Sequence, residues 1–170
     1  MNTPHPDLTV SLRGEQAEVA VITLNRPAKR NALNDGLILA IRDAFQNLPQ
    51  SVRAAVVDGT GEHFCAGLDL SELSERDASD GVFHSRMWHA ALECVEKGNV
   101  PVVAALHGAV VGGGLELASA CHIRVADETT FYALPEGTRG IFVGGGGAVR
   151  VPKLIGAARM TDMMLPGRAY

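Results

Sequence analysis

Residues 107–118 read HGAVVGGGLELA. The apolar run Val102–Leu106 directly before them is typical of a buried strand, and Gly114–Ala120 has the pattern of a helix. The glycine run 112–114 therefore lies where a strand passes into a helix. Free N–H groups and the dipole at such a helix start stabilise an anion, either a phosphate or an oxyanion that develops during a reaction. Tight packing of the helix against the strand explains the glycines equally well, so both interpretations stay open.

The glycine run differs from two common phosphate-binding motifs. It does not match G-x-G-x-x-G with an acidic residue after the next strand, and no Lys-Ser/Thr pair follows it. Only the glycines themselves therefore favour a nucleotide-binding domain.

Strand and helix patterns alternate along the rest of the chain. Strands are predicted over residues 19–24, 54–57, 102–106, 122–126 and 130–134. Helices are predicted from two apolar stripes, Leu37, Ile41, Phe45 and Leu48 in the first and Phe83, Met87, Ala91 and Val95 in the second. Asn34 or Asp35 can cap the first helix, and Pro49 stops it. This alternation predicts an α/β fold in which helices cover a sheet. No linker divides the chain, so we expect a single domain over residues 1–170.

Two glutamates stand at chemically interesting positions. Glu116 lies in the first turn of the helix that follows the glycines, and Glu136 follows Pro135 at the end of the strand 130–134. Two carboxyl groups can divide acid and base work if burial or neighbours separate their pKa values. Taken singly, each is more typical of a charge at a helix start or in a loop.

Two further segments are candidates for ligand contacts. FCAGLDL, residues 64–70, is a turn in which Ala66 and Gly67 leave room for a ligand and offer N–H donors. The loop 25–31, NRPAKRN, carries three cations that suit phosphate groups. An ordinary turn and a solvated loop are the simpler interpretations of these segments.

Composition excludes several classes of protein. The 170 residues are 46% hydrophobic, and 15 Lys and Arg against 19 Asp and Glu give a net charge of −4. This mildly acidic balance argues against nucleic acid or an anionic membrane as the main partner. The longest apolar stretch, residues 100–115, is shorter than the roughly 20 residues of a membrane span. Three cysteines without a C-x-x-C pair and histidines without ligand spacing predict no metal site and a reducing compartment. The first ten residues show no secretory signal, so we expect a cytoplasmic protein.

In combination, the motifs are more specific than any one of them. LNRPAKRNAL (24–33), FCAGLDL (64–70), HGAVVGGGLELA (107–118) and ALPEG (133–137) resemble the crotonase superfamily, the enoyl-CoA hydratases and isomerases. The resemblance runs from about Val19 to Tyr170. It implies a crotonase-like superhelix of repeated strand–strand–helix (ββα) units. Members usually continue with several more helices, so the resemblance implies that the C-terminal helical part is missing here.

The resemblance also implies roles for particular residues. The backbone N–H groups of Ala66 and Gly113 would form an oxyanion hole for the thioester oxygen of an acyl-CoA. Glu136 would protonate the α-carbon, and Glu116 would orient the water. The implied contacts to coenzyme A and substrate are Ala28, Lys29, Arg30, Ala66, Gly67, Leu68, Asp69, Leu70, Gly112 and Gly113.

The implied activity is that of a hydro-lyase, an enoyl-CoA hydratase that adds water syn across a trans-2-enoyl-CoA. Coenzyme A enters as part of the substrate, with no separate cofactor, and the family implies a homo-trimer or a hexamer built as a dimer of trimers. Double-bond isomerisation, decarboxylation and thioester hydrolysis use the same enolate and remain alternatives, as does a non-catalytic CoA-binding subunit. Leu68 stands where the family usually has alanine, and residues 138–144 replace a stretch that usually ends in Pro-Gly.

Overall fold

The computed structural model of the chain describes residues 5–72 and 77–170. The described strands are β1 (Leu8–Arg13), β2 (Val19–Leu24), β3 (Ala54–Gly59), β4 (Val102–Leu106), β5 (Ala109–Val111), β6 (Ile123–Ala126) and β7 (Phe131–Ala133). The α-helices are α1 (Asp35–Gln46), α2 (Ala78–Glu96), α3 (Gly113–Ala120), α4 (Gly147–Ile155) and α5 (Ala157–Met164). Short 3-10 helices cover Pro27–Lys29, Leu70–Glu72 and Gly137–Arg139.

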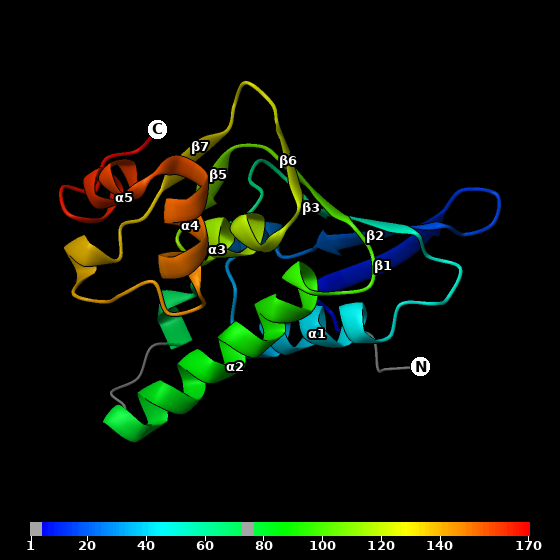
Figure 1. Cartoon of the computed structure of the whole chain (residues 1–170), viewed down its shortest axis with the longest axis horizontal. Coiled ribbons are helices and arrows are strands. Elements are labelled where there is room, and N and C mark those ends of the chain that lie inside the picture. Colours follow the sequence, from blue (N-terminus) through cyan, green and yellow to red (C-terminus); the bar gives the residue numbers. More distant parts are fainter. Residues whose placement is uncertain (1–4, 73–76) are drawn as a thin grey trace.

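The strands form two sheets, and the chain spirals between them. The larger sheet has the order β1-β2-β3-β4-β6, with β1 antiparallel to β2 and the other pairs parallel. In the smaller sheet β5 pairs in parallel with β7, and Cys65 adds a parallel bridge to Val110. Two turns of the spiral, β4-β5-α3 and β6-β7-α4, each supply one strand to each sheet and then a helix (Figure 1). The expected ββα superhelix is therefore present.

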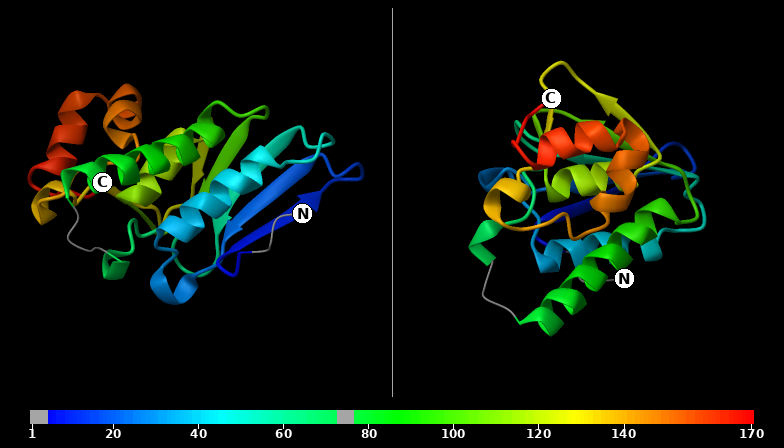
Figure 2. Two further views of the ribbon diagram at one scale, coloured as in Figure 1. Left: turned by 90° about the horizontal axis from the view of Figure 1, so that it is seen from below. Right: turned by 60° about the vertical axis from the view of Figure 1, so that its left-hand side comes forward.

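Helices cover the larger sheet because their apolar stripes are buried against it. In α1 the predicted stripe residues Leu37, Ile41 and Phe45 are buried. The helix α1 lies beside α2 across one face of the sheet (Figure 2). Every residue of α3 is buried, which fits a helix that is apolar on almost all sides. Glu116 and Gly113, which belong to α3, therefore stand on a well-packed element.

Several boundaries differ from the sequence predictions. The strands β1 and β5 were not predicted, and β5 is only three residues long between glycine-containing turns. The helix α1 ends at Gln46 rather than at Leu48, because the Asn47 side chain donates a hydrogen bond to the Asp43 carbonyl at 2.7 Å. The helix α2 begins at Ala78, where the Asp77 carboxylate accepts from the Asp80 N–H at 2.8 Å.

Candidate active site

Two glycine turns meet at the edge of the smaller sheet. Gly67 follows the Cys65 bridge, Gly112 follows β5, and both have positive φ values, 98° and 53°. A Cβ atom on Gly67 would lie 2.8 Å from the Val111 carbonyl oxygen and 3.4 Å from the Gly113 nitrogen. The glycines therefore allow these two chain segments, far apart in sequence, to approach more closely than side chains would permit.

The amides in these turns differ from the prediction in one respect. The Ala66 N–H donates to the Arg30 carbonyl oxygen at 2.9 Å, so its assignment as an oxyanion-hole donor is wrong. The N–H groups of Leu68 and Gly113, in contrast, donate no hydrogen bond within the described part of the chain. A Cβ atom on Gly113 would lie 3.6 Å from the Leu68 nitrogen, so the two unpaired amides are neighbours.

The hydrogen bonds made by the other amides of the turn explain why the sequence prediction chose the wrong N–H group. Cys65 and Ala66 both donate their N–H groups to neighbouring segments, and the Asp69 N–H donates to the Leu33 carbonyl. Between them, Leu68 is left with its N–H unpaired. These partners come from distant segments, and no local signal in FCAGLDL reveals them.

Glu116 lies in the first turn of α3 and is buried, with 4% of its surface exposed. Its Oε1 accepts hydrogen bonds from the Gly145 and Gly147 N–H groups, each at 2.8 Å. Burial raises the pKa of this carboxyl to about 7, and the negative charge of Glu136 adds to the rise. The two amides act in the opposite direction because they stabilise the charged form. Glu116 is thus poised to exchange a proton near neutral pH.

Glu136 has a different environment. It is buried, with 7% exposed, and its Oε2 has no hydrogen-bond partner among the described residues. Burial raises the pKa of this carboxyl, which favours its protonated form. A Cβ atom on Gly112 would lie 2.6 Å from Oε1 of Glu136, so this glycine makes room for the carboxyl.

Both carboxyl groups line one cavity of about 280 Å³. Gly113 belongs to its wall, which places the glycine-opened helix start in the same space as the two acids. The other walls include four apolar side chains and two polar ones: Leu68, Trp88, Ile141, Phe142, His84 and Ser85. Of these six, only Leu68 is among the contacts predicted from the sequence. The arrangement can hold a thioester oxygen against the amides, with an acid and a base beside it.

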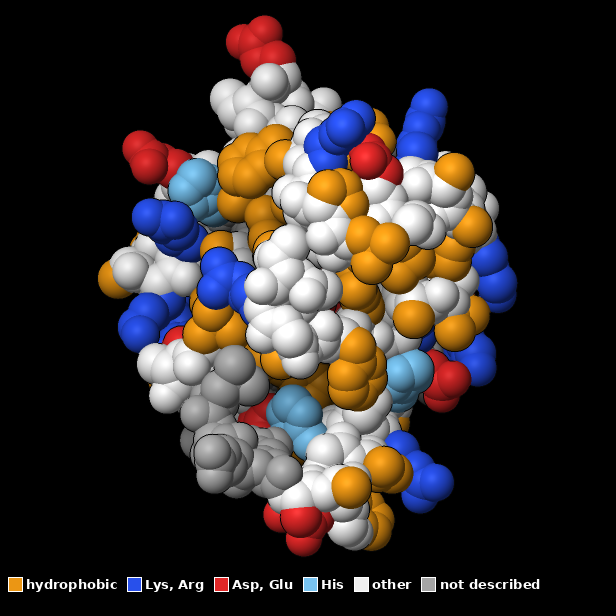
Figure 3. All heavy atoms as spheres, turned by 90° about the vertical axis from the view of Figure 1, so that its left-hand side faces the viewer, with side chains coloured by type: hydrophobic (Ala, Val, Ile, Leu, Met, Phe, Trp, Pro, Cys, Tyr) orange, Lys and Arg blue, Asp and Glu red, His pale blue; other side chains and the backbone are white. Residues whose placement is uncertain are grey.

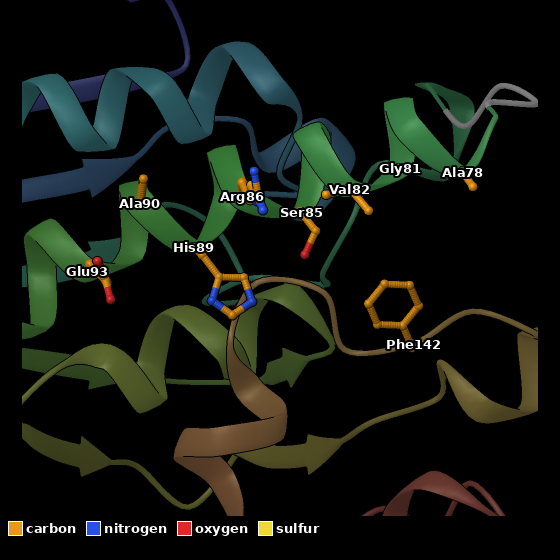
Figure 4. A pocket seen from close by; sticks show the side chains of 9 residues that line it. All are labelled: Ala78, Gly81, Val82, Ser85, Arg86, His89, Ala90, Glu93 and Phe142. Atoms are coloured by element: carbon orange, nitrogen blue, oxygen red, sulfur yellow. The ribbon is translucent and has the colours of Figure 1, made fainter.

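A second cavity, of about 590 Å³, lies along the outer side of α2. Side chains of α2 line it together with Phe142, and the ring of Phe142 lies across from Ser85 (Figure 4). The two cavities share Gly81, Ser85 and Phe142, so Phe142 stands between them. It is 71% exposed. Many hydrophobic side chains gather on the face of the molecule shown in Figure 3.

The predicted cation loop contains both structural and exposed charges. Arg26 is committed to the protein, because its Nη1 donates to Asp69 at 2.7 Å and its Nε lies 3.3 Å from Asp7. Lys29 and Arg30, with Ala28, are exposed and therefore available to a ligand. The Ala66–Arg30 hydrogen bond joins this loop to the turn 64–70.

Asp69, one of the predicted contacts to coenzyme A, uses its carboxylate within the protein. A hydrogen bond from the Ser71 hydroxyl and another from Arg26 lower its pKa to about 2. In the same turn, Leu70 is exposed and Leu68 faces the cavity. The turn therefore offers backbone and apolar surface to a ligand rather than this carboxylate.

The sequence model of the enoyl-CoA hydratase/isomerase family matches residues 14–170. The chain belongs to this family. Among solved structures, it is similar to a Rhodopseudomonas palustris protein whose name provisionally assigns it to the enoyl-CoA hydratases. The two are 60% identical with a TM-score of 0.93, over 96% of this chain and 62% of the other.

Two further relatives bear on the activity of this enoyl-CoA hydratase/isomerase family member. The 2,3-dehydroadipyl-CoA hydratase of Escherichia coli is 36% identical, over 91% of this chain and 60% of that protein. A Thermobifida fusca structure in complex with CoA, also provisionally named an enoyl-CoA hydratase, is 27% identical with a TM-score of 0.86. The match covers 96% of this chain and 65% of the Thermobifida fusca chain. The chain thus spans 60% of the length of this Escherichia coli relative, and 24% of the length of the Shewanella amazonensis fatty acid oxidation complex subunit alpha, which is 38% identical over 94% of this chain.

Two features are absent from residues 5–72 and 77–170 of this family member. No helix there is long and apolar enough to cross a membrane. No group of three or more His, Cys, Asp or Glu side chains in these ranges could hold a metal ion.

Proposed function

We propose that this chain carries the active site of an enoyl-CoA hydratase, a hydro-lyase that adds water syn across the double bond of a trans-2-enoyl-CoA. The observation that carries the proposal is the pair of buried carboxyl groups, Glu116 and Glu136, in one cavity with Gly113. The hydratase name of the Escherichia coli relative supports the same reaction. Coenzyme A would be part of the substrate, and a trimer or hexamer stays a prediction.

The unpaired amides of Leu68 and Gly113 are the proposed oxyanion hole. Addition of water to an enoyl thioester passes through an enolate-like state in which negative charge grows on the thioester oxygen. Two fixed N–H donors stabilise that charge more than they stabilise the neutral carbonyl. By analogy with other oxyanion holes, one such donor lowers the barrier by about 3 kcal/mol.

The two glutamates would divide the proton transfers. Glu116, with a pKa of about 7, is ionised in a large fraction of molecules near neutral pH and can take a proton from the attacking water. Glu136, whose Oε2 has no hydrogen-bond partner among the described residues, is the proposed proton donor to the α-carbon. Water then loses a proton to one side chain while the α-carbon gains one from the other, and the two glutamates exchange their protonation states.

The CoA moiety would contact the exposed loop at Lys29 and Arg30 and the backbone of the turn 66–70. These two segments are joined by the Ala66–Arg30 hydrogen bond, so they form one continuous edge beside the cavity. The CoA bound in the Thermobifida fusca structure supports an acyl-CoA ligand for this chain.

The test is the substitution Glu136→Gln. Removal of a positioned proton donor is expected to lower kcat on crotonyl-CoA by about 10²–10⁴-fold. Glutamine has nearly the same shape, so acyl-CoA binding should change little. Turnover is followed by the loss of enoyl absorbance, and binding by calorimetry with butyryl-CoA. The matched control is Glu128→Gln, since Glu128 is exposed in the β6–β7 turn. Unchanged turnover in the Glu136 variant would remove the assignment.

The same assay separates hydration from the other reactions of the enolate. A hydratase consumes the absorbance of crotonyl-CoA, whereas an isomerase leaves it and creates enoyl absorbance from a 3-enoyl-CoA. Binding of acyl-CoA without turnover of either substrate would indicate a non-catalytic CoA-binding subunit.

A further inference from the structure

The cavity that holds Glu116 and Glu136 also contains a histidine that the proposed reaction does not use. His84 lies on α2, and with Gly81, Ser85 and Trp88 it forms the face of that helix that lines the cavity. These positions follow helical spacing, so one side of α2 provides this wall. Any acyl group that fills the cavity must therefore pass a polar as well as an apolar surface.

The His84 ring is fixed by an aspartate at the start of α1. Its Nε2 lies 2.7 Å from Oδ1 of Asp35, and the Trp88 Nε1–H donates to the same oxygen at 3.0 Å. The ring planes of His84 and Trp88 are tilted by 50°, with centroids 5.8 Å apart. Asp35 is the first residue of α1, where the helix dipole favours a negative charge. The carboxylate therefore orients the imidazole.

This arrangement determines what the ring offers to a ligand. Because Nε2 is occupied by Asp35, Nδ1 is the remaining nitrogen, and it forms no hydrogen bond within residues 5–72 and 77–170. In the imidazolium form, Nε2–H donates to Asp35 and Nδ1–H is a second donor. A carboxylate is the group that gains most from such a charged donor. The neighbouring Ser85 hydroxyl is committed to the Gly144 carbonyl at 2.7 Å, so His84 is the polar contact left on this wall of the cavity.

The size of the cavity limits the acyl group. A volume of about 280 Å³ holds roughly nine non-hydrogen atoms if each takes about the 30 Å³ of a water molecule. That is enough for an acyl group of five or six carbons with a polar end.

We propose that His84, positioned by Asp35, selects acyl-CoA substrates whose acyl group ends in a carboxylate, that is, monothioesters of short dicarboxylic acids. The inference rests on the proposed function, because it assumes that the acyl group of the substrate enters this cavity. Here His84 is a specificity-determining residue, and Asp35 acts through it as a positioning residue.

The test compares binding of matched ligands, so it does not depend on turnover. Calorimetry on this chain would measure Kd for glutaryl-CoA against pentanoyl-CoA and for adipoyl-CoA against hexanoyl-CoA. His84→Gln keeps a group near Asp35 but removes the Nδ1 donor, and Asp35→Asn removes the charge. In both variants the carboxylate ligands should weaken by about tenfold relative to their methyl-ended partners, as expected for a hydrogen bond to a charged group.

The control is His89→Gln, because His89 is on the same helix but lines the outer cavity shown in Figure 4. It should leave the ratio of the two Kd values unchanged. Circular dichroism would check the fold of each variant. His84→Asn is a second variant, in which the side-chain amide places a donor close to the Nδ1 position. An unchanged ratio in folded His84→Gln would overturn the inference while leaving the hydratase proposal intact. Failure of the wild-type chain to bind any of the four ligands would instead contradict the proposed function, and the inference with it.

Discussion

Hydrogen bonding distinguishes two glutamates that sequence alone makes look equivalent. Glu116 and Glu136 are both buried, but two backbone amides hold one oxygen of Glu116, while Oε2 of Glu136 has no partner in the described structure. Burial raises the pKa of both carboxyls, and the amides limit the rise at Glu116. This asymmetry gives the two carboxyl groups different environments, which suits a reaction that divides acid and base work between them.

The pKa of Glu116 makes stability depend on pH. The folded pKa is about 7 against 4.5 for an ordinary glutamate, so between these values the folded chain binds more protons than the unfolded chain. The contribution to stability is fully present below pH 4.5 and is lost as pH rises through 7. The change in the free energy of unfolding is about 3 kcal/mol in total. Urea unfolding at pH 5 and pH 8 should show a smaller loss of stability for Glu116→Gln than for the wild type. An equal loss in both would contradict the shifted pKa.

The position of helix α3 depends on a glycine, Gly114, that contacts the neighbouring turn. A Cβ atom on Gly114 would collide with the carbonyl oxygen of Cys65 and lie 2.8 Å from the Cys65 Cβ. Gly114→Ala should therefore push α3 away from the turn, at a cost in stability of about 1–3 kcal/mol. The same shift separates the Gly113 and Leu68 amides, so kcat on crotonyl-CoA should fall as well. Chemical unfolding and the absorbance assay measure the two effects.

The control for this substitution is Gly81→Ala in α2. No heavy atom lies within 4 Å of a Cβ atom placed there. Alanine is the better helix former, so stability should rise by up to about 1 kcal/mol. A Gly114 variant as stable as the Gly81 variant would show that α3 can move without cost.

The elements that sequence predicted well are those with a periodic apolar pattern. The α1 stripe is buried as expected, because burial of one face is what the pattern encodes, and β2 forms over the predicted residues 19–24. The glycine-opened start of α3 was also predicted. The N–H donor in the 64–70 turn was not predicted correctly. The Ala66 N–H donates to the carbonyl oxygen of Arg30, which lies more than thirty residues away in the sequence. Similarly, nothing near His84 in the sequence indicates that Asp35 lies against it.

For the whole molecule, one ion-pair network connects three parts of the chain. Arg26, after β2, contacts Asp69 in the glycine turn and Asp7 before β1, and it also donates to the Ala32 carbonyl at 3.2 Å. The side chain of Asp69 is only 6% exposed, so its charge is compensated by these partners rather than by water. The network thus joins the edge of the larger sheet to the turn that carries the Leu68 amide.

Asp69→Asn should therefore destabilise the whole molecule at neutral pH. The half-buried Arg26 guanidinium would keep Asp7 but lose its charged partner at 2.7 Å, at a cost of about 2 kcal/mol, the value typical of a hydrogen bond to a charged group. Because the pKa of Asp69 is lowered to about 2, its contribution is present above pH 4 and disappears as the pH falls toward 2. Thermal unfolding at pH 7 and pH 2.5 should show a large difference in unfolding temperature between variant and wild type at the higher pH and a smaller one at the lower.

Asp43→Asn is the matched control, since the Arg42–Asp43 pair is exposed and its loss should change stability by less than about 1 kcal/mol. If both variants unfold at the wild-type temperature at pH 7, the Arg26 network does not stabilise the fold.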